Sequence, residues 1–140
     1  MSSTASSRIL LVDDDAHVLH NVKRLLERQG YCVAIHDGGP GCSNVAAHFR
    51  PDLVLVDVKM PFLSGEAFVS LIGKQFGLVP PTVVLFSAID ELTLQKTALA
   101  CGADGYISKS DSGLDFARKV AAFLFDGRAK RQATEAQSRP

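Results

Sequence analysis

Short apolar runs alternate with longer amphipathic segments along most of the chain. The runs are nearly continuous in apolar character, which is typical of strands buried on both faces of a parallel sheet. The longer segments repeat apolar residues every three or four positions, as one face of a helix requires. The pattern predicts strands over Arg8–Val12, Tyr31–Ile35, Leu53–Val56, Val83–Phe86 and Tyr106–Ser108. It predicts helices over Ala16–Gln29, Pro40–Phe49, Glu66–Phe76, Glu91–Cys101 and Leu114–Phe125. This alternation indicates an α/β sandwich with right-handed crossovers.

Residues between the segments support these boundaries. Asp15 suits the N-cap of the first helix, and Gly30, Gly102 and Gly127 suit helix ends. Pro40 suits the first turn of a helix, because its missing N–H is not needed there. The weak alternation of Tyr31–Ile35 indicates a strand at the edge of the sheet.

Length and charge favour a single small domain. The chain has 140 residues and a formal net charge of zero, so its charge balance gives no indication that it binds nucleic acid or a membrane. We expect a disordered tail over residues 1–7, the domain over 8–126, and a flexible tail or the start of a linker over 127–140. No signal peptide or membrane-spanning run is visible, and we expect a cytoplasmic protein.

The three cysteines form neither a CxxC pair nor a zinc-binding spacing. We interpret Cys42 and Cys101 as small core residues on apolar helix faces, and Cys32 as partly exposed on the edge strand. His17 and His20 lie one helical turn apart and could bind a metal. A solvated helix face is the favoured interpretation, because no third ligand is in view.

Polar side chains follow four of the predicted strands. Asp13 and Asp14 follow the first, Asp57 the third, Ser87 the fourth and Lys109 the fifth. In an open parallel sheet the carboxyl ends of the strands lie along one edge, which is where ligands bind. The sequence therefore predicts a site containing three carboxylates, a hydroxyl and an ammonium group.

In this ordered set the chain resembles the receiver domain of bacterial two-component response regulators, over about residues 8–126. Pro61 and Gly65 fit the family's loop after the phosphorylated aspartate, and Gly102–Ile107 resembles its lead into the last strand. The resemblance implies a flavodoxin-like, doubly wound, five-stranded parallel sheet of order 2-1-3-4-5 with five helices. It also implies that Asp57 accepts a phosphoryl group from a histidine kinase or a phosphotransfer protein and slowly hydrolyses back. Such a domain is not a conventional enzyme, although it catalyses its own phosphorylation and dephosphorylation.

An acyl phosphate forms when a carboxylate oxygen attacks phosphorus, so two anions must approach each other. Three carboxylates would repel strongly, and a divalent cation would remove that repulsion. Mg²⁺ prefers oxygen ligands and keeps several waters. We assign Asp14 and Asp57 as direct ligands, Asp13 as a ligand through water, and the backbone carbonyl of Lys59 as a further ligand.

Two further side chains would contact the phosphoryl group. Lys109 would pair with one phosphoryl oxygen, and Ser87 would donate a hydrogen bond to another. Each assignment has an alternative that stays open. Asp13 and Asp14 could lie in a solvated turn, Asp57 could be an ordinary loop carboxylate, Ser87 could satisfy the turn after its strand, and Lys109 could be a surface lysine.

Tyr106 is either a core aromatic with a hydrated hydroxyl or part of a switch. In the family an aromatic residue here moves inward when the hydroxyl corresponding to Ser87 is drawn to the phosphate, and we favour that switch.

Leu92 and Leu99 lie opposite the core stripe of their helix. The face formed by the fourth helix, the fifth strand and the fifth helix could therefore bind an output protein or domain, or a second copy.

Two departures from the family pattern affect these expectations. Ser110 stands where most receivers have proline, which puts the family's cis peptide bond in doubt. Gln95 and Lys96 occupy the stretch where receivers that pair symmetrically carry an arginine.

Lys59 and Ile89 lie at the family's variable positions that tune hydrolysis of the phosphoryl group. Because Ile89 cannot orient a water, we expect a long-lived phosphoryl group.

Rival classes fit less well. A haloacid-dehalogenase-like phosphatase needs a second aspartate where Lys59 stands, and a flavin carrier needs a phosphate loop where the three aspartates stand. A receiver-like interaction module that works without phosphorylation is the alternative function. The sequence does not identify the kinase, the output, the oligomeric state or whether the chain is part of a longer regulator.

Overall fold

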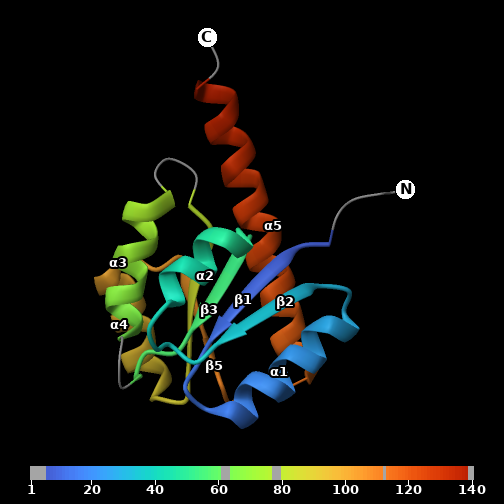
Figure 1. Ribbon diagram of the computed structural model, residues 1–140, viewed down its shortest axis with the longest axis vertical. Coiled ribbons are helices and arrows are strands. Elements are labelled where there is room, and N and C mark those ends of the chain that lie inside the picture. The colour runs from blue at the N-terminus through green and yellow to red at the C-terminus, as the bar shows by residue number, and fades with distance from the viewer. Residues whose placement is uncertain (1–5, 61–63, 77–79, 112, 139–140) are drawn as a thin grey trace.

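The computed structural model describes residues 6–60, 64–76, 80–111 and 113–138. Within them one parallel sheet has the strand order β2-β1-β3-β4-β5, with helices on both faces (Figure 1). The strands are β1 (Arg8–Val12), β2 (Cys32–His36), β3 (Leu53–Val56), β4 (Thr82–Ser87) and β5 (Gly105–Ser108). The helices are α1 (Ala16–Arg28), α2 (Cys42–Phe49), α3 (Gly65–Phe76), α4 (Glu91–Cys101) and α5 (Gly113–Ser138). The predicted fold and strand order are confirmed, and β2 is an edge strand as expected.

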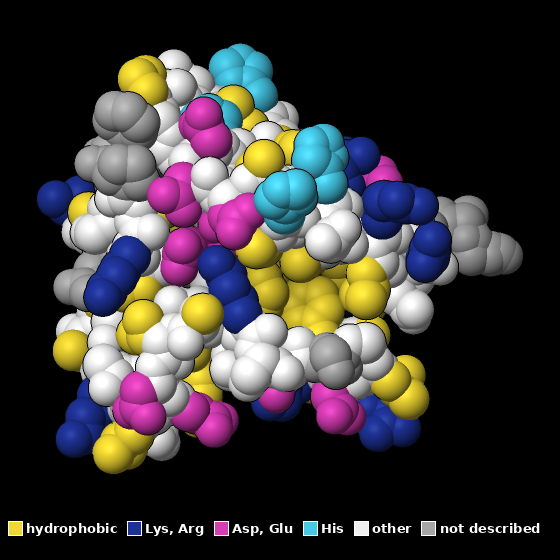
Figure 2. Space-filling model, turned by 90° about the horizontal axis from the view of Figure 1, so that it is seen from below, with side chains coloured by type: hydrophobic (Ala, Val, Ile, Leu, Met, Phe, Trp, Pro, Cys, Tyr) yellow, Lys and Arg dark blue, Asp and Glu magenta, His cyan; other side chains and the backbone are white. Residues whose placement is uncertain are grey.

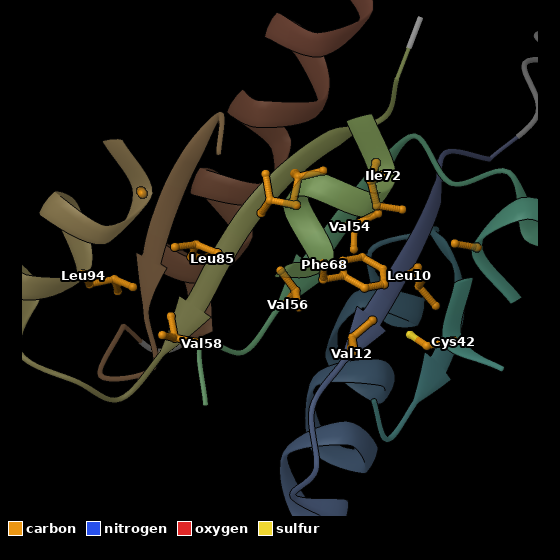
Figure 3. Close-up of a cluster of buried hydrophobic side chains, with 14 residues drawn as sticks. Leu10, Val12, Cys42, Val54, Val56, Val58, Phe68, Ile72, Leu85 and Leu94 are labelled. Carbon is orange, nitrogen blue, oxygen red and sulfur yellow. The ribbon is translucent and has the colours of Figure 1, made fainter. Parts of the chain in front are cut away.

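Alternate residues of each strand face opposite sides of the sheet and build two separate cores. Leu10 and Val12 of β1 belong to one cluster, and Ile9 and Leu11 belong to the other. The first cluster, which we call the α2–α4 layer, adds Cys42, Ala46, Phe68, Val69, Ile72, Leu94 and Ala98 from α2, α3 and α4 (Figure 3). The second cluster, the α1–α5 layer, adds Leu19, Leu26, Phe116, Val120 and Leu124 from α1 and α5. The strands are largely apolar because both of their faces are covered.

Several local predictions can be checked against the helix ends. Asp15 caps α1, since its side chain accepts hydrogen bonds from the backbone N–H groups of His17 and Val18. Gly102 ends α4 in the left-handed conformation with φ 80°. The placement of Pro40 in the first turn of a helix is wrong. Gly41, with φ 89°, is the N-cap of α2, so the chain turns once more after Pro40 before the helix begins.

The cysteine predictions are confirmed. Cys42 is buried in the α2–α4 layer and Cys101 packs against it, whereas Cys32 is exposed on the edge strand. All three thiols are free. Burial, with the nearby Asp37 carboxylate, raises the pKa of the Cys42 thiol to about 11, so Cys42 is a packing residue rather than a nucleophile.

The predicted end of the last helix near Phe125 is wrong. The helix α5 continues through Gly127 to Ser138 and rises beyond the sheet (Figure 1). Gly127 is buried, and a Cβ at this position would overlap Thr82 Oγ1. The glycine therefore serves close packing of α5 on β4. Arg131 holds the next turn, with Nη1 3.3 Å from the Asp52 carbonyl oxygen and Nη2 3.6 Å from Asp52 Oδ1.

Among the described residues, no helix combines the length and the apolar character needed to cross a bilayer.

We predict that Gly127→Ala lowers the free energy of unfolding by about 1–3 kcal/mol, as overpacking of a close contact does. In an open helical position the same change would stabilise by about 1 kcal/mol, so the sign is diagnostic. Urea denaturation measures the difference. In a Thr82→Ala background the loss should shrink, because the overlapping oxygen is gone. A more stable Gly127→Ala chain would contradict this account of the glycine.

Candidate functional site at the carboxyl edge of the sheet

The register of the sheet brings the predicted site residues to one edge. Val12 of β1 is paired with Val56 of β3, so Asp13 and Asp57 leave the sheet side by side. Ser87 of β4 is paired with Ser108 of β5, which places Lys109 next to them. Two backbone hydrogen bonds extend the ladder past the strand ends, from Asp57 N–H to the Val12 carbonyl oxygen at 3.0 Å and from Lys109 N–H to the Ser87 carbonyl oxygen at 2.8 Å. These backbone hydrogen bonds fix the positions from which the Asp57 and Lys109 side chains project.

Three carboxylates converge at this edge. One oxygen from each of Asp13, Asp14 and Asp57 lies within 4.8 Å of the others, and no other cluster of potential metal ligands exists among the described residues. Asp13 is completely buried, Asp57 is 8% exposed and Asp14 is exposed. Three like charges this close repel unless cations neutralise them. The exposed His17 and His20 do not contribute to such a cluster.

Lys109 supplies one positive charge to this cluster. Its Nζ lies 2.6 Å from Asp13 Oδ2 and 3.5 Å from Asp57 Oδ2, and 5.7 Å from the centre of the Phe86 ring. Asp13 Oδ1 accepts a hydrogen bond from Asp15 N–H at 2.9 Å. The contact with Lys109 does not have hydrogen-bond geometry, so the buried Asp13 Oδ2 accepts no hydrogen bond from the residues described. A buried carboxylate oxygen without a donor is costly and favours a further cation or hydrogen-bond donor.

Burial dominates the electrostatics of Asp57. It raises the pKa of this carboxyl above its ordinary value, and the Asp13 carboxylate raises it further. Lys109 lowers the pKa, as do hydrogen bonds from the backbone N–H groups of Lys59 and Val58, but these contributions do not overcome burial. Asp57 is therefore an anion that is not fully compensated in the chain alone.

Ser87 is buried and engaged in its own turn. Its Oγ accepts a hydrogen bond from Ile89 N–H at 3.3 Å, which is the contact expected if the hydroxyl satisfies the turn after β4. That bond uses the oxygen as an acceptor and leaves the hydroxyl proton able to point elsewhere. The Ile89 side chain is half-buried against the α2–α4 layer, and Lys59 is exposed.

Tyr106 lies between the core and the surface. Its half-buried ring packs against the α2–α4 layer and borders a cavity of about 400 Å³ between α4, β5 and α5. Leu92 and Leu99 of α4 are 58% and 76% exposed, as their position opposite the core stripe predicts. The switch itself stays a prediction, because one conformation of the ring is described.

The loop after β5 is held by serines in place of the expected proline. Ser108 Oγ lies 2.8 Å from Ser110 Oγ and accepts a hydrogen bond from Ser110 N–H at 3.1 Å. No cis peptide bond occurs in the described chain, which includes Lys109–Ser110. Pro61, part of the family resemblance, lies outside the described residues, whereas Gly65 begins α3.

Sequence reasoning did not foresee an apolar groove beside the carboxylates. Figure 2 looks onto this edge and shows acidic side chains around a lysine, next to an apolar hollow. The groove encloses about 280 Å³ between α1 and α5, and its lining includes Val18, Val22, Leu25, Phe86, Lys109 and Phe116. The lack of a side chain at Gly113, on the rim, was the available signal that α1 and α5 leave a gap.

Comparisons with known proteins agree with this geometry. Residues 9–120 match the family of response regulator receiver domains. The transcriptional regulatory protein PrrA of Mycobacterium tuberculosis is 32% identical over 123 residues, covering 88% of this chain and 52% of PrrA. The response regulator MprA of Mycobacterium sp. (strain KMS) is 33% identical over 117 residues, covering 84% of this chain and 50% of MprA. The chain thus spans about half the length of these curated relatives.

Solved structures give the same result for the fold. A CheY-like response regulator receiver domain protein from Methanospirillum hungatei aligns with a TM-score of 0.78 and 27% identity, covering 89% of this chain and 98% of that one. The BeF3-activated N-terminal receiver domain of Klebsiella pneumoniae RstA aligns with a TM-score of 0.76 and 24% identity, covering 84% and 98%. At that identity the second similarity supports the fold alone.

We predict that Asp57→Asn raises the free energy of unfolding at neutral pH in metal-free buffer. Because the pKa of Asp57 is raised in the folded chain, the folded state binds a proton more readily than the unfolded state. Wild-type stability therefore decreases as pH rises through the ordinary aspartate range, about pH 4, towards the raised value. The advantage of Asn should be complete above the raised pKa and absent below pH 4.

Urea denaturation at a series of pH values with a chelator present tests this expectation. A gain in stability that does not change with pH would show that its source is not the carboxylate charge. A loss of stability at neutral pH would show that the ion pair of Asp57 with Lys109 outweighs burial.

Proposed function

The chain belongs to the response regulator receiver domain family, and we propose that it accepts a phosphoryl group on Asp57 from a histidine kinase or a phosphotransfer protein. The observation that carries the proposal is the convergence of three carboxylates on one lysine. Lys109 Nζ is within 3.5 Å of both Asp13 and Asp57, and Asp14 completes the cluster at the solvent side. Relatives named as response regulators and transcriptional regulators support this assignment.

Burial separates the roles of the three carboxylates. Asp13 is fully buried and paired with Lys109, so it has no route to an incoming phosphorus atom. Asp57 keeps a small exposed area and has a raised pKa, which marks an anion that gains from new positive charge. We therefore assign the attacking oxygen to Asp57, with Lys109 holding the negative charge of the phosphoryl group.

The acidic cluster fits a magnesium ion. The buried Asp13 Oδ2 lacks a hydrogen-bond donor, and carboxylate oxygens are the ligands that Mg²⁺ prefers. Asp14 and Asp57 would hold the ion directly, Asp13 through a water, and Lys59 through its backbone carbonyl. When bound, the ion supplies the positive charge that lets a phosphoryl donor approach these anions.

Ser87 and Tyr106 connect the site to a surface in this proposal. The Ser87 hydroxyl now accepts from Ile89 N–H and can donate to a phosphoryl oxygen if its loop moves. Tyr106 packs against the core and borders the cavity between α4, β5 and α5, so a movement of its ring would change that face. The face of α4, β5 and α5, with the exposed Leu92 and Leu99, then binds an output protein or domain, or a second copy.

The proposal predicts phosphorylation at Asp57 alone. With Mg²⁺ and acetyl phosphate, intact-mass measurement should show one phosphoryl group on the wild-type chain and none on Asp57→Asn. Asp14→Ala should lose both Mg²⁺ affinity and phosphorylation, whereas Asp13→Ala should lose less, since it acts through water. Modification of the Asn variant would refute Asp57 as the acceptor. A folded wild-type chain that is never modified by kinases or acetyl phosphate would favour an interaction module that works without phosphorylation.

The lifetime of the phosphoryl group gives a second prediction. Hydrolysis requires a water in line with phosphorus, and the apolar Ile89 side chain cannot orient one, while the exposed Lys59 can cover the phosphoryl oxygens with its stem. We expect Lys59→Asn/Ile89→Glu to lose phosphate about ten-fold or more faster than wild type, a smaller gain than the roughly 100- to 10,000-fold effect of a well-positioned general base. Phosphate release followed over time measures both rates. Equal rates would show that these two positions do not limit hydrolysis.

A further inference from the structure

The turn after β5 carries Lys109, the cation on which the proposed function depends. Its Nζ lies 2.6 Å from Asp13 Oδ2 and 3.5 Å from Asp57 Oδ2. The contact with Asp13 lacks hydrogen-bond geometry, so it attracts the ammonium group without fixing its direction. The flexible four-carbon stem of a lysine adds no constraint of its own. The position of Nζ therefore depends on the backbone from which the side chain leaves.

Hydrogen bonds hold the peptide group on each side of Lys109. The peptide before it is held because Lys109 N–H donates to the Ser87 carbonyl oxygen at 2.8 Å. The peptide after it is held because Ser110 N–H donates to Ser108 Oγ at 3.1 Å. A third bond, from Asp111 N–H to the Ser108 carbonyl oxygen at 3.0 Å, closes the turn. With both flanking peptides held, the two soft dihedrals of Lys109 are set, and so is the direction of its Cα–Cβ bond.

Of these three bonds, one depends on a side chain. Its acceptor, Ser108 Oγ, belongs to a buried residue at the last position of β5. The hydroxyl proton of Ser108 can point to Ser110 Oγ, 2.8 Å away, so the group is used as both acceptor and donor within the turn. Ser110 is exposed, and water can satisfy its N–H when Ser108 does not. The bond therefore matters more for the geometry of the turn than for the stability of the fold.

We propose that Ser108 is a positioning residue for the phosphorylation of Asp57, because its hydroxyl holds Lys109 where the ammonium group can meet a phosphoryl oxygen. This role rests on the proposed function, which makes Asp57 the acceptor. The Lys109–Ser110 peptide is trans, and Ser110 supplies the N–H that Ser108 binds. A proline at position 110 has no N–H and would remove this bond. The two serines therefore work as a pair in place of a rigid ring.

A purely structural role for Ser108 would have different consequences. Damage to the end of β5 would lower the stability of the fold and disturb the acidic cluster as a whole. A positioning role acts through Lys109 alone, and a displacement of roughly 1 Å at a reacting group can lower a rate about 100-fold. Stability, phosphorylation rate and metal affinity therefore respond differently in the two cases.

Phosphorylation of the 140-residue chain by acetyl phosphate with Mg²⁺, followed by intact mass, measures the role of Ser108. Ser108→Ala should lower the rate constant about ten-fold or more, with a urea midpoint close to that of wild type. Ser108→Thr keeps a hydroxyl acceptor and should retain the wild-type rate. Ser110→Ala is the matched control, because it removes a hydroxyl from the same turn and keeps the N–H that Ser108 binds. It should be phosphorylated at close to the wild-type rate, and equal rates for Ser108→Ala and wild type would overturn the proposal.

A Lys109→Ala background shows whether Ser108 acts through the lysine. If it does, Ser108→Ala lowers the rate no further once the ammonium group is gone. Titration with Mg²⁺ alone gives a second measurement. The affinity of Ser108→Ala for Mg²⁺ should not fall, because the carboxylates stay in place and the ammonium group competes with the ion less well. A fall in Mg²⁺ affinity as large as the fall in rate would show a distorted acidic cluster and overturn the positioning role.

Amide hydrogen exchange, followed by NMR without a phosphoryl donor, separates this role from the proposed function. In Ser108→Ala the Ser110 amide should exchange faster, while the Lys109 amide, bonded to Ser87, stays protected. An unchanged Ser110 amide would show that Ser108 does not hold the turn, even in a chain that is phosphorylated normally. Faster exchange in a chain whose wild type is never phosphorylated would instead place the failure in the proposed function.

Discussion

The ion pair between Lys109 and the buried Asp13 is the interaction on which the site depends. A carboxylate with no solvent exposure is tolerated only when a cation lies beside it, and Lys109 Nζ is 2.6 Å away. Lys109 can stay there because β5 is paired in register with β4 and its backbone N–H continues that ladder to Ser87. The register of β5 on β4 therefore also determines the electrostatics of the site, because a slip of β5 would leave Asp13 without its ion pair.

The same pair leaves the edge of the sheet deficient in positive charge. Three carboxylates share one ammonium group, and the backbone N–H groups of Lys59 and Val58 only partly offset the burial of Asp57. A site of this kind has a low affinity for additional anions by itself and a high affinity for cations. Anion chemistry here is therefore conditional on a cation, which makes the domain responsive to what it binds rather than constantly active.

The sequence predicted that these side chains meet at one edge of the sheet, because each of them adjoins an apolar strand. Asp13, Asp57, Ser87 and Lys109 needed only the rule that parallel strands end at one edge. Sequence pattern could not reveal that Lys109 lies closer to Asp13 than to Asp57, since that depends on side-chain distances.

The last helix was predicted too short because Gly127 was interpreted as a local stop signal, whereas its role depends on contact with Thr82, which is 45 positions earlier. The groove between α1 and α5 was missed for a similar reason, because a gap between two helices is a property of their packing.

The separation of the two cores by the sheet bears on how binding at one surface affects another. Tyr106 packs in the α2–α4 layer, whereas the neighbouring Ile107 packs in the α1–α5 layer, so the sheet stands between them. The two layers nevertheless meet beside β5, because the Tyr106 ring and the α5 side chains of Lys119 and Phe123 line the same cavity. A rearrangement of the ring therefore changes the surroundings of α4 and of α5 together, so a partner bound beside one of these helices alters the affinity of the surface beside the other.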